Sequence, residues 1–175
     1  NVEATSWRHL GGVTLGVCHQ AEVVRINDNR GGGYEAATRK DVTVVVPDRR
    51  LYSAPGRAPA DPGGDRRTVA LADVRPTDVL VVSLDRLDLP GSIIDVVTPP
   101  HVGLAALWSF GEALRVACAT HLDVDPSELS LGLQPTRFGG RQTRRLFLAD
   151  RLENGAGYAP YLGQPKVFAA ILDEL

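Results

Sequence analysis

Residues 78–84 constrain the fold of this chain more than any other segment. They read DVLVVSL, and the run VLVV is apolar on both of the sides that alternate along a strand. A strand of this composition is buried on both faces, as the central strand of a sheet is. We therefore expect a sheet with this segment at its centre.

Further strands are predicted by β-branched runs and by the turn residues that bound them. They are expected within residues 12–28, 42–46, 130–135 and 144–150. Pro47 ends the second of these runs, because proline cannot donate a hydrogen bond to a sheet. The last two strands are expected to be joined by a loop over residues 136–143.

The clearest helix is expected over residues 101–121. Pro99 and Pro100 lie at its start, where a missing backbone N–H costs little. Apolar or small residues recur along it at helical spacing and form one stripe: Leu104, Leu107, Gly111, Leu114 and Cys118. Because of its place on the stripe, we interpret the cysteine as a core residue rather than a nucleophile.

Two further helical segments complete the pattern. Asp125 can cap a short helix that begins at Pro126, and residues 159–175 are expected to be helical with a break near Pro165. The order of elements predicts an α+β fold, with a central mixed sheet, two main helices and a Pro/Gly-rich surface loop.

One domain is expected over residues 1–175. Residues 53–67 read SAPGRAPADPGGDRR, which is too rich in Pro, Gly and Asp to bury much apolar surface, so we expect a flexible loop there. The chain contains no Met and stops inside an expected helix. We interpret it as a fragment of a larger protein.

Charge and cysteine content limit the classes of function. The chain has 19 Lys and Arg against 21 Asp and Glu, a net charge of −2, so any nucleic-acid contact must come from a local patch. Cys18 and Cys118 lie far apart, which predicts neither a metal-ligand pair nor a disulfide framework. The high content of Arg, Ala, Val, Gly and Pro indicates a GC-rich, bacterial genome. The sequence has neither a membrane-spanning run nor a signal peptide, and we expect a cytoplasmic protein. No cofactor is expected in this chain.

Two segments rich in Asn and Gly are expected to form turns, because these residues tolerate left-handed backbone. Their turn residues are Asn27, Asp28, Asn29 and Gly31 in the first segment, and Asn154, Gly155 and Gly157 in the second. The first segment has oxygen ligands for a hard cation, but not the spacing of a calcium loop. Backbone amides of the second segment can hold a phosphate at a helix N-terminus, although the residues of a P-loop are absent. A structural turn is the simpler interpretation of each.

The most basic segment is TRFGGRQTRR, residues 136–145, which contains no acidic residue. Guanidinium groups suit phosphate geometry, and a phenyl ring can stack on a base. We predict that this segment binds nucleic acid, together with Arg30 from the first turn. The residues assigned to this contact are Arg137, Phe138, Arg141, Arg144 and Arg145. A solvated hairpin loop without a partner is the alternative.

No residue is assigned a catalytic role. Asp150 and Glu153 are close in sequence, but they have no partner base or metal motif beside them. Trp108 and Phe110 flank the apolar stripe of the long helix. They either pack in the core or form an interface with a partner.

Four segments together resemble the helicase-associated MrfA-type zinc-binding domain family, named for mitomycin-repair helicases. In chain order they are EVVRINDNRGGGY, TDVL, FGEALRVACATHLDVDPSELSLGLQP and LFLADRLENGAGYA. The resemblance extends over about residues 12–175, apart from the Pro-rich loop. The Pro-Gly-Gly-Ala-Gly turn that is usual in the family is Glu153-Asn154-Gly155-Ala156-Gly157 here, with two substitutions.

The resemblance implies an accessory role beside a superfamily 2 DNA helicase, in DNA repair or in DISARM-type anti-phage defence. Its partners would be DNA and a helicase motor, which lies in the same polypeptide or in a partner subunit and holds the ATP site. The zinc-binding cysteines of the family follow the last helix, so zinc is expected only downstream of these residues. A protein-interaction scaffold with no DNA contact of its own is the alternative.

Overall fold

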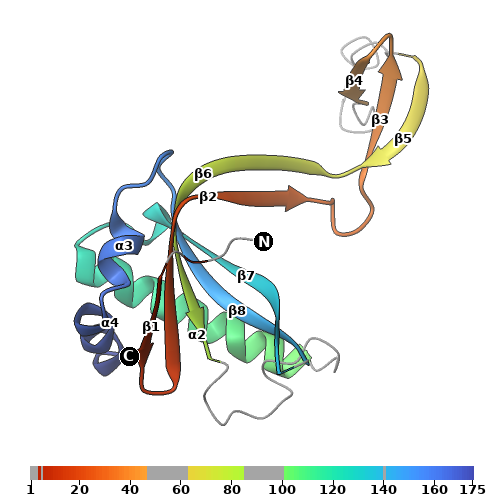
Figure 1. Ribbon diagram of the computed structural model, residues 1–175. Coiled ribbons are helices and arrows are strands. Elements are labelled where there is room, and N and C mark those ends of the chain that lie inside the picture. Colours follow the sequence, from red (N-terminus) through yellow and green to blue (C-terminus); the bar gives the residue numbers. More distant parts are fainter. Residues whose placement is uncertain (1–3, 5, 47–62, 85–100, 140) are drawn as a thin grey trace. The chain divides into compact units, whose positions relative to one another are not determined.

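The computed structural model describes residues 4, 6–46, 63–84, 101–139 and 141–175 (Figure 1). Where one domain was expected over residues 1–175, the chain divides into two compact units. The first contains residues 1–23 and 75–175, and the second contains residues 24–74. The prolines expected at the start of the long helix lie outside the described residues.

The first unit is built on a five-stranded antiparallel sheet with the strand order β1-β2-β6-β8-β7. Its strands are β1 (Ser6–Leu10), β2 (Val13–Asn27), β6 (Leu71–Ser83), β7 (Leu129–Phe138) and β8 (Arg141–Asp150). β6 is the middle strand, and its second half is buried from Thr77 to Ser83. The structure therefore confirms the mixed α+β class and the central place of residues 78–84, whereas the sheet, which was expected to be mixed, is antiparallel.

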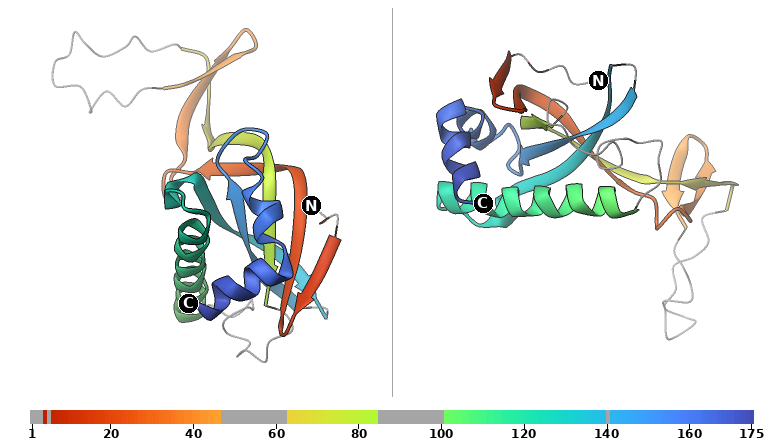
Figure 2. Two further views of the ribbon diagram at one scale, coloured as in Figure 1. Left: turned by 90° about the vertical axis from the view of Figure 1, so that its left-hand side faces the viewer. Right: turned by 90° about the horizontal axis from the view of Figure 1, so that it is seen from below.

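Helices cover one face of this sheet (Figure 2). They are α2 (His101–Leu122), the short 3-10 helix η3 (Pro126–Glu128), α3 (Tyr158–Leu162) and α4 (Pro165–Asp173). The main core forms where α2, α3 and α4 meet the sheet, and its largest fully buried side chains include Leu15, Leu80, Leu114, Leu146 and Phe168. The predicted long helix and the predicted break at Pro165 are both confirmed.

α2 packs closely against the hairpin of β7 and β8. A Cβ atom at Gly111 would lie 2.9 Å from methyl groups of Leu131 and Leu146, so a larger residue there would force these two side chains to shift. Further along the same face, Cys118 is fully buried, and burial raises the pKa of its thiol to about 12. This confirms that the cysteine is a core residue.

The opposite face of the sheet carries a second, smaller cluster of buried side chains: Cys18, Ala21, Val79, Val81 and Ala149. Two aromatic rings on this face lie against glycines of the neighbouring strand. Cβ atoms at Gly16 and Gly132 would approach the rings of Trp7 and Phe147 to 2.8 and 2.2 Å. Glycine at these two positions therefore lets each ring lie on the backbone of the adjacent strand.

The second unit holds a three-stranded sheet with the order β4-β3-β5. Its strands are β3 (Tyr34–Arg39), β4 (Val42–Val45) and β5 (Asp65–Val69). Ala36 and Ala37 on the middle strand are buried, whereas Val42 and Val44 on the edge strand are 61% and 40% exposed. The predicted strand at residues 42–46 is thereby confirmed.

Two sequence-based expectations about loops are wrong in part. The loop expected over residues 136–143 is mostly sheet, because Phe138 pairs with Arg141 and the ladder continues from there to Leu129 and Asp150. The flexible loop expected over residues 53–67 ends earlier: Asp65, Arg66 and Arg67 pair with β3. Backbone pairing overrides the turn-like composition in both places, and residues 53–62 lie outside the described residues.

Candidate functional site

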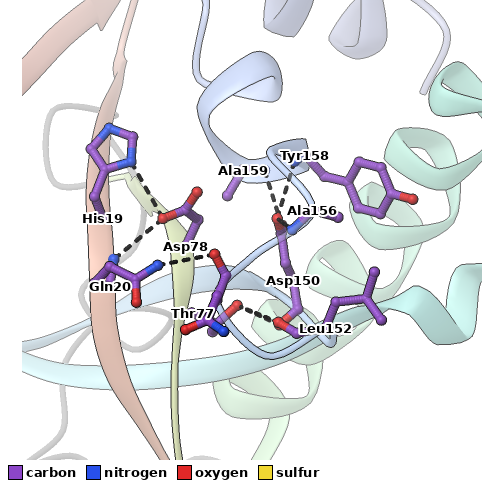
Figure 3. Close-up of polar contacts among 10 residues, drawn as sticks. His19, Gln20, Thr77, Asp78, Asp150, Leu152, Ala156, Tyr158 and Ala159 are labelled. Carbon is purple, nitrogen blue, oxygen red and sulfur yellow. Dashed lines mark hydrogen bonds and ion pairs between the residues drawn. The ribbon is translucent and has the colours of Figure 1, made fainter.

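The carboxylate of Asp150, at the end of β8, binds the loop that follows it (Figure 3). The N–H groups of Ala156 and Tyr158 donate to Oδ2 at 2.8 and 3.1 Å, and that of Ala159 donates to Oδ1 at 3.0 Å. Asp150 itself is 3% exposed. The amides at the start of α3 are thus occupied by a carboxylate of the same chain, which favours a structural turn over a phosphate site.

The loop backbone is left-handed at three of its residues. Asn154, Gly155 and Gly157 have φ angles of 68°, 82° and 81°. Gly155 is also held close to the central strand, because a Cβ atom there would lie 2.9 Å from Oδ2 of Asp78. The two glycines therefore have different neighbours although their backbone conformations match.

Asp78 connects the central strand β6 to β2. Its Oδ1 lies 3.3 Å from Nδ1 of His19 and accepts the N–H of Gln20 at 3.2 Å. Gln20 has a φ of 52° inside the strand, and its side-chain amide donates to the carbonyl oxygen of Asn154 at 2.9 Å. Gln20, with its unusual backbone conformation, is therefore hydrogen-bonded to β6 through its N–H and to the loop through its side chain.

Thr77 fixes the other end of the same loop. It is 3% exposed, and its Oγ1 lies 2.9 Å from the carbonyl oxygen of Asp150 and 3.1 Å from that of Leu152. Figure 3 shows Thr77 and Asp78, two consecutive residues of β6, at the centre of these contacts. We call the set formed by His19, Gln20, Thr77, Asp78, Asp150 and Asn154 the loop clamp.

The electrostatics of the loop clamp follow from burial. Desolvation raises the pKa of Asp150; the three backbone N–H bonds oppose the rise, and the nearby charge of Asp78 adds to it. At the rim of the loop, the hydroxyl of Tyr158 donates to Oε2 of Glu128 at 2.9 Å, which raises the pKa of the tyrosine.

The loop clamp resembles a catalytic site only superficially. A histidine bonded to a carboxylate is an arrangement used for general-base catalysis. Here Asp78 also accepts a backbone N–H, and both carboxylate oxygens of Asp150 accept backbone N–H groups of the loop. Within the part of the chain that the structure describes, no group of three or more His, Cys, Asp and Glu could hold a metal ion. The geometry is that of a clamp that shapes the fold.

The predicted nucleic-acid residues of the β7–β8 hairpin do not all gather on one face. Arg144 and Arg145 are consecutive on β8, so their side chains leave opposite faces of the sheet. Arg144 pairs with Pro135 and Arg145 with Gln134. Arg137 is exposed near the tip of the hairpin, where Phe138 pairs with Arg141. The basic segment therefore presents arginines on both faces.

Arg145 contacts an aromatic ring that the sequence analysis did not consider. Its guanidinium carbon lies 4.9 Å from the ring centroid of Trp7 on β1, close enough for a cation–π interaction. Trp7 is 40% exposed although its ring lies against Gly16. The contact joins strands at opposite ends of the sequence.

The sixth predicted residue, Arg30, belongs to the second unit. It is exposed, with a φ of 58°, in the turn where the N–H of Asn29 donates to Oδ1 of Asn27 at 3.1 Å and that of Gly33 donates to the carbonyl oxygen of Asp28 at 2.7 Å. Gly31 follows with a φ of 84°. The side chains of Asn27 and Asn29 are thus bonded to the backbone of their own turn.

The outer side of α2 is unusually apolar for an exposed surface. Trp108 is 38% exposed and Val116 is 46% exposed, whereas Phe110 packs against the core. The rest of this side consists of the small residues Ala105, Ala106, Ser109, Ala113 and Thr120 and of one exposed carboxylate, that of Glu112, which pairs with Arg115. A groove of about 530 Å³ runs beside Val116 toward Leu175. We call this side, from Ala105 to Thr120, the outer α2 face.

Sequence reasoning missed several residues of these sites. Trp7, His19 and Gln20 lie in strands whose patterns carry no functional motif, and their contacts join residues far apart in the chain. A composition scan could have marked Trp7 only as an aromatic near the N-terminus. The pairing of Asp78 with β2 has no signal in the sequence at all.

No protein-family model matches the chain. Over 74 residues it is 43% identical to Druantia protein DruE of Escherichia coli (strain UMEA 4076-1), an alignment that covers 40% of this chain and 4% of that protein. Its fold matches the crystal structure of the DUF1998 helicase MrfA bound to DNA, with a TM-score of 0.54 and 12% identity. That match covers 98% of this chain and 19% of the helicase chain.

The chain therefore corresponds to a small part of each of these proteins. The expected resemblance is confirmed, because the structural neighbour is itself a helicase of the MrfA type. Among the described residues, no helix is long and apolar enough to cross a membrane.

Proposed function

We propose that this chain is a non-catalytic module of a superfamily 2 DNA helicase or helicase complex in anti-phage defence or DNA repair. The observation that carries the proposal is the match of nearly the whole chain, 98%, to part of a helicase bound to DNA. The local identity to a Druantia protein supports the defence setting. The loop clamp supports a non-catalytic role, since its carboxylates accept hydrogen bonds from backbone amides.

Within this role the module contributes a DNA contact through the β7–β8 hairpin. The contact residues are Arg137, Phe138, Arg141, Arg144 and Arg145, with Arg30 as a further contact from the second unit. Since Arg144 and Arg145 leave opposite faces, the contacts of the hairpin with the sugar–phosphate backbone are divided between its two faces.

The test is DNA affinity across several salt concentrations for the wild type and for a variant with Arg137, Arg141, Arg144 and Arg145 replaced by Ala. Each lost phosphate contact should lower the slope of log affinity against log salt by about 0.7 for single strands or 0.9 for duplex. A control variant removes four exposed positive charges elsewhere, at Arg39, Lys40, Arg67 and Lys166. Equal slopes for the two variants would contradict a hairpin contact.

A second candidate function is docking of a helicase motor or partner subunit without DNA contact. The outer α2 face favours it, because an exposed helix face rich in small and apolar residues is typical of a protein interface. The measurement is binding of the motor domain from the same helicase system to the wild type and to Trp108→Asp and Val116→Asp. Lys166→Asp serves as the control. If these α2 substitutions leave motor binding unchanged, the outer α2 face is not the docking surface.

A further inference from the structure

We propose that Trp7 and Arg145 form a binding site for single-stranded nucleic acid on the face of the sheet opposite the helices, with a base stacked beside the indole and a phosphate on the guanidinium. The inference rests on the proposed DNA-binding function. It adds a specific site, a residue outside the basic segment and a preference for unpaired bases.

The first observation is the exposure of Trp7. A large aromatic ring gains stability by burial, yet this ring is 40% exposed on a strand at the sheet edge. Its Cζ3 and Cε3 edge lies against Gly16, where a Cβ atom would come within 2.8 Å. The ring is thus fixed against β2 while part of its surface faces solvent.

The second observation is the position of Arg145. Its guanidinium carbon lies 4.9 Å from the centroid of the Trp7 ring, so the cation–π contact restricts where the guanidinium lies. A guanidinium held in this way binds a phosphate with less loss of side-chain entropy than a free arginine does. Exposed rings and arginines on a sheet are the groups that bind single strands in general.

The third observation concerns what surrounds the pair. Phe147, two residues along β8 from Arg145, shares its face and lies half-buried against Gly132. Gln134 is the direct cross-strand neighbour of Arg145. The site therefore continues along the hairpin with an aromatic and an amide side chain, both of which suit an extended nucleic-acid strand better than an apolar peptide.

Fluorescence gives a direct test, because Trp7 and Trp108 are the two tryptophans of the chain. In a Trp108→Phe variant, all tryptophan emission comes from Trp7. Titration with a short oligothymidylate should quench this emission at the same concentrations at which binding is seen by anisotropy of a labelled probe. The reciprocal Trp7→Phe variant, with Trp108 retained, should show little quenching.

Affinity measurements complete the test. Trp7→Ala should weaken binding of the oligothymidylate about tenfold, Trp7→Phe should keep most of it, and Arg145→Lys should fall between wild type and Arg145→Gln. Circular dichroism and the thermal midpoint show whether each variant remains folded. If Trp7→Ala does not fold, the quenching experiment alone decides.

The outcomes separate this site from the wider proposal. If the wild type binds the oligothymidylate but Trp7 emission does not change and Trp7→Ala binds equally well, the site is wrong and the DNA-binding function stands. Duplex DNA bound more tightly than the single strand would likewise overturn the stacking site. If the wild type binds no nucleic acid, both the Trp7–Arg145 site and the proposed DNA-binding function are wrong.

Discussion

At the residue scale, two carboxylates lie side by side on the neighbouring strands β6 and β8. Val79 pairs with Ala149, so Asp78 and Asp150 are cross-strand neighbours one position further along. Like charges at such positions repel each other. The chain offsets this repulsion with donors from two segments: the imidazole of His19 and the N–H of Gln20 on β2, and the loop amides that bind Asp150.

The first prediction concerns Asp150 itself. Asp150→Ala leaves the amides of Ala156, Tyr158 and Ala159 without their acceptor in a largely buried place, so we expect the free energy of unfolding to fall by about 2–4 kcal/mol. Denaturant titration measures this. Glu153→Ala, exposed in the same loop, is the control and should change stability by less than about 0.5 kcal/mol. Similar effects for both substitutions would contradict the clamp.

The second prediction concerns pH. Burial raises the pKa of Asp150 above its ordinary 3.8, so the folded state binds this proton more tightly than the unfolded state does. Its contribution to the free energy of unfolding therefore decreases as the pH rises from 3.8 through the raised value. Asp150→Asn should remove this dependence, which denaturant midpoints between acidic and neutral pH would show.

Asp125 provides a control of opposite sign. Its hydrogen bond from Ser127 lowers its pKa below 3.8, so its contribution is present at neutral pH and is lost as the pH falls. Asp125→Asn should therefore weaken the decrease in the free energy of unfolding that accompanies a fall in pH. If the two substitutions changed the pH profile in the same direction, the assignment for Asp150 would be wrong.

Most of these side-chain contacts could not be predicted from the sequence. Asp125 as a cap could be predicted, because capping acts within a few residues. Asp150 could be placed only as the end of a strand. Its partners are set by how the loop folds back, and those of Asp78 lie 58 and 59 residues away on β2. Local patterns contain no information on contacts of that separation.

At the element scale, the turn after β8 depends on two glycines with nearly equal backbone angles but different surroundings. Gly155 has a φ of 82° and lies against Asp78, whereas Gly157 has a φ of 81° and no atom within 4 Å of the position its Cβ would occupy. The pair therefore separates the cost of backbone conformation from the cost of close packing.

The third prediction uses this pair. Gly157→Ala should destabilise the fold by about 1–2 kcal/mol, the cost of placing alanine in left-handed backbone. Gly155→Ala carries the same cost, and its Cβ must also displace the carboxylate of Asp78, so we expect a clearly larger loss. Thermal unfolding of both variants gives the comparison. Equal losses would show that the loop does not approach Asp78 so closely.

Elements were predicted well where one local signal dominated. The long helix, the break at Pro165 and the central strand follow from spacing, proline and a continuous apolar run. The hairpin of β7 and β8 was underestimated, since Arg, Gln and Thr in residues 136–143 resemble a loop in composition. Pairing with the opposite strand, which composition does not record, extends both strands almost to Gly139.

At the scale of the whole molecule, the second unit is inserted between two neighbouring strands of the first. β2 crosses from the first unit to the second after Val23, and β6 returns at Arg75. Both buried clusters of the larger sheet consist of residues from the first unit alone. The sequence does not mark this division, because the segment between these points contains strand patterns like those around it.

The fourth prediction follows from this arrangement. Replacing residues 24–74 by a short Gly-containing linker between Val23 and Arg75 should leave the first unit folded, because its cores lose no side chain. Trp7 and Trp108 both belong to this unit, so their fluorescence reports on it. We expect one cooperative unfolding transition; a variant without one would show that the first unit needs the second.

The loop clamp also has a consequence for the order of folding. The bond between Gln20 and Asn154 spans 134 residues, and Asp150 finds its donors only after Ala159 has been made. Contacts of such separation form late and slow the folding of a chain. During synthesis, the unusual backbone of β2 at Gln20 therefore gains its last partner only after Asn154 has been made.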